Sequence, residues 1–86
     1  MGYRFYVFSK NAEYFEGIEE AIQALKDNES TGYVALGVQK GFLYACDIVI
    51  KENDKYRISL DYTKSDNFKD DSTTLSIIET LKKELM

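Results

Sequence analysis

Residues 33–62, YVALGVQKGFLYACDIVIKENDKYRISLDY, decide the fold of this 86-residue chain, because they read as three consecutive β-strands. β-Branched and aromatic residues dominate segments 33–39, 42–51 and 56–62, as is typical of strands. The linkers between them are short: Lys40-Gly41 supplies a glycine for a tight hairpin, and residues 52–55 supply Asn and Asp, which tolerate left-handed backbone. Links this short predict an antiparallel meander.

Alternation within these strands predicts which side chains face the core. In segment 42–51 the row expected to face inward is Phe42, Tyr44, Cys46, Ile48 and Ile50, and the outer row is Leu43, Ala45, Asp47 and Val49. A carboxylate needs solvent or a partner, so Asp47 favours exposure of the outer row. A buried functional acid is the other interpretation of Asp47, although no base or metal ligand lies near it in sequence.

Outside this region the pattern predicts one more strand and two helices. Residues 3–8 are aromatic and β-rich and form the expected first strand, and residues 9–13 read as a polar turn. A helix is expected over residues 17–27 from the apolar spacing of Ile18, Ala21, Ile22 and Leu25. Asp71 or Ser72 is expected to cap the last helix, which buries Leu75, Ile77, Ile78, Leu81 and Leu85.

The resulting order is β-α-β-β-β-α, an α+β fold. We expect residues 1–86 to form a single domain, in which an antiparallel four-stranded sheet carries two helices on one face.

The chain contains no histidine and a single cysteine, Cys46. Without histidine there is no Ser-His-Asp or Cys-His arrangement and no imidazole ligand for zinc. The position of Cys46 in the apolar alternation predicts a packed core residue rather than a reactive thiol. We therefore expect no catalytic residue, no metal site and no cofactor, and a protein that is not an enzyme.

The outer face of the sheet is the predicted interaction surface. With both helices on the other face, Leu43, Asp47 and Val49 are expected to lie beside Tyr6 and Tyr33 from the first two strands. Tyrosine is enriched at protein interfaces, and an exposed apolar face of this kind favours binding or self-association. The alternative is that the segment after the first strand covers this face.

Fifteen acidic and eleven basic residues give a net charge of −4. The acidic excess around the start of the first helix consists of Glu13, Glu16, Glu19 and Glu20. Acids there suit the positive end of the helix dipole, and the alternative is an acidic surface that occupies the DNA-binding groove of another protein. The basic residues that could form a local strip are Lys40, Lys51, Lys55 and Arg57. At this net charge we do not expect nucleic-acid binding, which depends on neutralising phosphates.

The chain carries no apolar run approaching the roughly 18 residues that a membrane helix needs, and its first residues do not resemble a signal peptide. A lone cysteine without an export signal is typical of a reducing compartment. We expect a cytoplasmic protein without membrane contact.

Four segments carry a resemblance to a known group of domains: FYVF at residues 5–8, YFEGIEEAI at 14–22, YVALGV at 33–38 and CDIV at 46–49. They resemble small accessory domains of conjugative elements and phages, of the kind associated with large polyvalent proteins or with antirestriction-type products. The resemblance implies a mobile-element setting and non-enzymatic binding, and it provides no catalytic residue.

The residues predict a non-enzymatic protein-binding module, and the resemblance implies that it is encoded on a mobile element and acts against or alongside host defence. Two alternatives remain open: a nucleic-acid-binding accessory domain, and a homodimeric structural domain that associates through its apolar sheet face.

Overall fold

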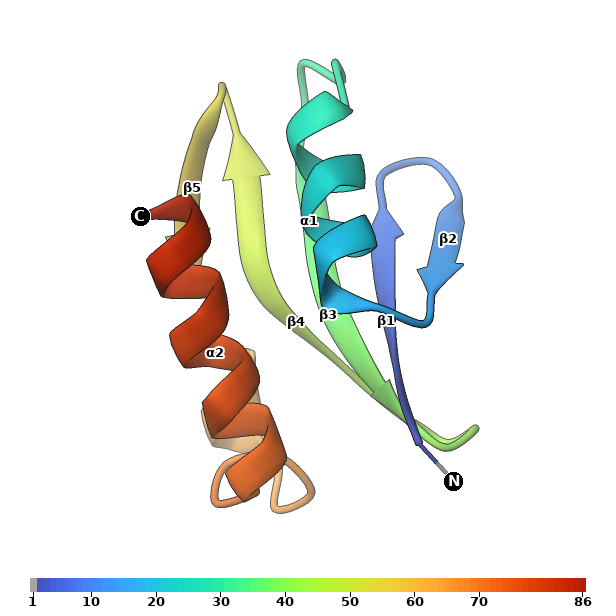
Figure 1. The fold of residues 1–86 in the computed structure, drawn as a ribbon, viewed down its shortest axis with the longest axis vertical. Coiled ribbons are helices and arrows are strands. Elements are labelled where there is room, and N and C mark those ends of the chain that lie inside the picture. The colour runs from blue at the N-terminus through green and yellow to red at the C-terminus, as the bar shows by residue number, and fades with distance from the viewer. Residues whose placement is uncertain (1) are drawn as a thin grey trace.

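The computed structural model describes residues 2–86 and contains a five-stranded antiparallel sheet with two α-helices (Figure 1). The strands are β1 Tyr3–Phe8, β2 Ala12–Phe15, β3 Val34–Lys40, β4 Tyr44–Glu52 and β5 Lys55–Ile58. The helices are α1 Ile18–Asp27 and α2 Ser72–Leu85, and a 3₁₀ helix, η1 Leu60–Lys64, precedes α2. Across the sheet the order is β2-β1-β3-β4-β5.

The α+β class and the antiparallel sheet are confirmed, whereas the expected four strands and the order β-α-β-β-β-α are wrong. A fifth strand, β2, begins at Ala12, inside the segment 9–13 expected to be a polar turn, and pairs Phe15 with Phe5 and Tyr14 with Tyr6 of β1. This edge strand is four residues long and mostly exposed, so its hydrophobic pattern is weak. Residue 1 of the expected domain lies outside the described residues.

Both helices lie on the same face of the sheet, as expected for this α+β arrangement (Figure 1). The buried helical positions are Ala21, Ile22 and Leu25 in α1, and Thr74, Ile77, Ile78 and Leu81 in α2. Leu75, expected in the buried stripe of α2, is instead 41% exposed, because the stripe passes through Thr74 and Ile77. The helices and the sheet enclose a core that also takes in Phe68, which anchors the loop between η1 and α2.

A β-bulge in β4 divides its side chains between the two faces. Gly37 of β3 pairs with Asp47, but the preceding residue Leu36 pairs with Val49, so Ile48 is an extra residue on β4. Beyond the bulge the alternation is reversed: Val49 packs in the core beside the helices, and Ile50 points to the opposite face with its register partner Ala35. The prediction that Val49 lies on the outer face is therefore wrong.

The third strand of the meander is shorter than the expected segment 56–62. β5 ends at Ile58, and the Ser59 amide then donates a hydrogen bond of 2.8 Å to the carbonyl oxygen of Ile48 at the bulge. From Leu60 the chain winds into η1, and Leu60 is exposed rather than part of a buried row. The part of β4 before the bulge therefore has no pairing with β5, and η1 packs against β4 instead.

Lys51 follows the bulge and is turned toward the helices. Its ammonium donates hydrogen bonds of 3.0, 3.0 and 2.7 Å to the carbonyl oxygens of Leu25, Lys26 and Asn28. Carbonyls at a helix C-terminus lack partners within the helix and favour a cation. All three ammonium donors are therefore used, and Lys51, only 5% exposed, fastens the end of α1 to β4.

Asp71 caps the first turn of α2, as predicted. Its carboxylate accepts hydrogen bonds from the Thr74 amide at 2.9 Å, the Thr74 hydroxyl at 2.8 Å and the Tyr3 hydroxyl at 2.8 Å. The Lys40 ammonium lies 3.5 Å from its other oxygen. The bonds from Thr74 and Tyr3 lower the pKa of Asp71 to about 2. The cap therefore links α2 to β1 and β3.

Within residues 2–86 no helix is both long and apolar enough to span a membrane.

Candidate interaction surface

We call the face of the sheet opposite the helices the open face. A row of residues on this face crosses four strands. Tyr6 of β1 is the register partner of both Tyr14 of β2 and Gly37 of β3, and Gly37 is in turn the partner of Asp47 of β4. The Tyr6 and Tyr14 ring centroids are 6.4 Å apart in a tilted arrangement. The antiparallel register therefore brings two aromatic rings and a carboxylate into line although they are far apart in sequence.

Tyr6 reaches Asp47 by lying across β3 at Gly37. Its hydroxyl donates a hydrogen bond of 2.5 Å to Asp47 Oδ1. A β-carbon at position 37 would overlap both the Tyr6 ring and the carbonyl oxygen of Cys46. Glycine inside a strand often marks such a close approach, and here the Tyr6 ring fills the space that a side chain at Gly37 would need.

Asp47 accepts a second hydrogen bond on its other oxygen. The Tyr33 hydroxyl donates to Oδ2 at 3.1 Å. Tyr33 lies four residues before Gly37, which is the register partner of Asp47. The Tyr33 side chain must therefore extend along the open face past Ala35 to reach the carboxylate. Asp47 is thus held between two phenols, one from β1 and one from the residue before β3.

Both phenols act as neutral donors at physiological pH. Burial of the ring and the bond to Asp47 raise the pKa of Tyr6, and burial and the Asp47 charge raise the pKa of Tyr33. Within residues 2–86 no cation lies within ion-pair distance of Asp47. The carboxylate is hydrogen-bonded, but its charge is not neutralised.

A hollow of about 390 Å³ opens on the open face beside this row. It is lined by Tyr6, Phe8, Ala12, Tyr14, Gln39, Ala45 and Asp47. Its walls are mainly apolar, with Asp47 as the charged group. Arg4 borders the same area: its guanidinium lies 4.6 Å from the Tyr14 ring centroid and donates to Gln39 Oε1 at 3.2 Å. This arrangement offers aromatic surfaces and one fixed acceptor, which is a binding chemistry.

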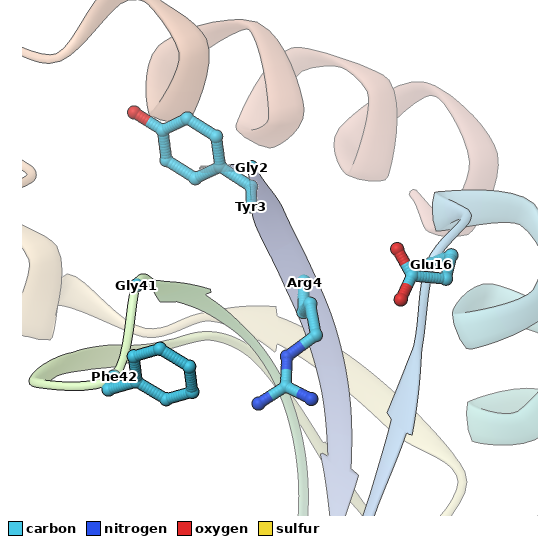
Figure 2. Close-up of a pocket in the computed structure, with 6 residues that line it drawn as sticks. All are labelled: Gly2, Tyr3, Arg4, Glu16, Gly41 and Phe42. Atoms are coloured by element: carbon cyan, nitrogen blue, oxygen red, sulfur yellow. The ribbon is translucent and has the colours of Figure 1, made fainter.

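A second hollow, of about 290 Å³, lies at the end of the sheet near the β3–β4 turn, and Figure 2 shows its lining. Arg4, Glu16 and Phe42 surround it, whereas the Tyr3 ring is directed toward α2, where it bonds to Asp71. Phe42 is 82% exposed here, so this hollow is bordered by a turn rather than by a rigid wall.

The structure brings together three of the five residues predicted for the interaction surface. Tyr6, Tyr33 and Asp47 are joined directly by hydrogen bonds on the open face. Leu43 is 84% exposed but belongs to the turn between β3 and β4 rather than to a strand. Val49 is fully buried among the core side chains, because the bulge reverses the alternation just before it.

The four predicted acidic residues are all exposed and follow one another through β2, its connection to α1 and the first turn of α1. They are Glu13, Glu16, Glu19 and Glu20. The last two lie in the first turn of α1, where the helix dipole favours them. Within the described part of the chain none of the four lies within ion-pair distance of a base.

The basic strip considered for nucleic acid does not form a continuous surface. Lys51 is buried against the end of α1, and Lys40 pairs with Asp71 on the helix side. Lys55 and Arg57 are exposed on the edge strand β5.

Sequence reasoning did not assign Tyr14, Gln39 or Ala12 to the surface. The alternation of Ala12 and Tyr14 is a signal for β2, but it spans too few residues to stand out. No protein-family model, curated protein sequence or solved structure matches the chain, so function has to be inferred from the residues themselves.

Proposed function

We propose that the protein is a non-enzymatic protein-binding module that engages its partner through the open face of the sheet. The observation that carries this proposal is the exposure of three aromatic side chains on that face: Phe8 is 44%, Tyr14 is 51% and Tyr33 is 45% exposed. They surround a row whose geometry is fixed by Gly37 and Asp47. Rigid aromatic side chains are the residues that dominate protein interfaces, because they provide contact area at low entropic cost.

The distribution of positive charge favours a protein partner over nucleic acid. Affinity for nucleic acid comes mainly from basic side chains that neutralise phosphates. Of the residues that line the hollow none is basic, and Lys51 is used inside the fold. The mobile-element setting and an action on host defence remain part of the proposal through the resemblance alone.

A pair of matched variants tests the proposal. Phe8→Lys places a positive charge on the open face, and Leu75→Lys places one at an apolar position of similar exposure, 41%, on α2. We expect the wild-type protein and Leu75→Lys to retain the same binding protein from a lysate of the source cells, and Phe8→Lys to lose it. Equal retention by both variants would contradict binding through the open face.

Self-association through the same face is the competing outcome. Light scattering over a concentration series distinguishes the two, because a homodimer held by the open face dissociates in Phe8→Lys and persists in Leu75→Lys. A wild-type monomer that retains a different protein supports the module proposed here, whereas a dimer with this response replaces it.

A further inference from the structure

We propose that the hollow beside Tyr6 and Asp47 binds a basic side chain, lysine or arginine, of the protein partner. This inference rests on the proposed function and adds the chemistry that the partner must present.

The Asp47 carboxylate is the acceptor that a cation in the hollow would meet. Asp47 receives one hydrogen bond on each carboxylate oxygen, from Tyr6 and from Tyr33. An ionised carboxylate can accept about four hydrogen bonds, so each oxygen retains an unused site. Both donors are neutral, and Asp47 lines the hollow with its charge unpaired. A cation that enters the hollow would form a charge-assisted hydrogen bond there, which is stronger than a bond between neutral groups.

The walls of the hollow are largely aromatic. Tyr6, Phe8 and Tyr14 contribute three aromatic rings to a hollow whose only charged lining residue is the carboxylate. Cations are attracted to the faces of aromatic rings. The protein already uses this chemistry at the border of the hollow, where the Arg4 guanidinium lies 4.6 Å from the Tyr14 ring centroid. Arg4 covers one face of the Tyr14 ring, so a second basic group would use the remaining aromatic surface of the hollow and the Asp47 carboxylate.

The charge and the size of the hollow both suit a basic side chain. None of the lining residues is basic, and the whole chain has a net charge of −4, so a basic partner is attracted over distance and an acidic one is repelled. The volume of about 390 Å³ lies in the range of about 300–1,000 Å³ that is typical of sites for small ligands. One extended basic side chain fits such a space.

The test uses small analogues of single side chains with the ¹⁵N-labelled protein. Nα-acetyl-lysine methylamide and Nα-acetyl-arginine methylamide, with their side chains unmodified, are the cationic probes. Nα-acetyl-glutamine methylamide is the neutral probe. We expect the cationic probes to shift the backbone amide signals of Gly37, Ala45 and Asp47, with an affinity that weakens as salt is added. The glutamine analogue should leave these signals in place.

Two variants and a control locate the effect. Asp47→Asn keeps the shape of the side chain but removes the charge, and it should weaken cation binding by about tenfold or more. Tyr14→Leu removes one aromatic wall from an exposed edge strand and should also weaken binding. Asp66→Asn removes a charge from a side chain that is 94% exposed and paired with Lys69 outside the hollow, and it should leave binding unchanged.

The inference is overturned if the neutral probe shifts the same amides as strongly, or if Asp47→Asn remains folded and binds the cations as well as the wild type. Either result would leave the proposed function intact as long as Phe8→Lys, and not Leu75→Lys, still loses the partner. Loss of that contrast would instead remove the open face as the binding surface.

Discussion

Replacing Gly37 with alanine should destabilise the protein strongly, although it adds a single methyl group. The new β-carbon would overlap both the Tyr6 side chain and the Cys46 carbonyl oxygen. The carbonyl belongs to β4, which pairs with the central strand β3, so it cannot move without disturbing the sheet. Relief must come from displacement of the Tyr6 ring or from separation of the two strands.

The expected magnitude follows from these two consequences. Overpacking a rigid site costs about 1–3 kcal/mol. Displacing Tyr6 also breaks its hydrogen bond to the Asp47 carboxylate, and bonds to charged groups contribute about 1.5–3 kcal/mol. We expect the free energy of unfolding to fall by about 3 kcal/mol. For a domain of this size that corresponds to a decrease of about 12–24 °C in Tm.

The assay is urea unfolding followed by circular dichroism and tyrosine fluorescence, with Gly32→Ala as the control. Gly32 has open space around its β-position and no left-handed backbone, so alanine there should be neutral or stabilise the protein by about 0.4–1 kcal/mol. In a Tyr6→Ala background the cost of Gly37→Ala should shrink to the part caused by the Cys46 carbonyl. If the free energies of unfolding of Gly37→Ala and Gly32→Ala differ by less than about 0.5 kcal/mol, the close approach of Tyr6 to β3 is refuted.

Three further predictions concern single side chains. Lys51→Met should lower the free energy of unfolding by about 2–4 kcal/mol, because three carbonyl oxygens lose a charged donor. Lys64→Met, at a side chain that is 78% exposed, should change the free energy of unfolding by less than about 0.5 kcal/mol. Similar effects of the two variants would contradict the cap on α1. Burial raises the pKa of Cys46 to about 11, so its thiol should react with iodoacetamide at pH 8 much more slowly in the folded protein than in urea; equal rates would show that the thiol is accessible. The pKa of Asp71 is about 2 in the folded protein and 3.8 in a free side chain, so the unfolded chain binds the proton first and stability should fall as the pH drops through this window; Asp71→Asn should remove this part of the pH dependence of urea unfolding, and an unchanged profile would argue against the cap.

The helices were predictable because their signal is long and redundant. In α1 the apolar residues repeat over about two turns, and the structure buries Ala21, Ile22 and Leu25 as that spacing indicates. The turn between β4 and β5 was predictable for a chemical reason: Asn53 and Asp54 both adopt positive φ, which these residue types tolerate. In each case local sequence and tertiary structure favour the same conformation.

The bulge was not predictable from alternation, because the residues on both sides of it are apolar. Ile48, Val49 and Ile50 are all fully buried, two in the core under the helices and one on the open face. An apolar run of this kind fits either register equally well. The assignment of Val49 to the outer face failed for this reason, and so did that of Lys51 to a basic surface.

The candidate site lies where two departures from regular strand structure meet. Glycine in a strand interior and an extra residue on the neighbouring strand both weaken the pairing of β3 with β4, and here the bulge directly follows the pair of Gly37 with Asp47. A sheet selected for stability alone would have a β-branched residue at position 37 and no interruption after Asp47. The glycine instead admits the Tyr6 ring, and the bulge lets Asp47 point to the open face while both residues that follow it enter the core. Irregularities that lower stability and together fix the geometry of one acceptor are the pattern expected where a surface has been shaped for binding.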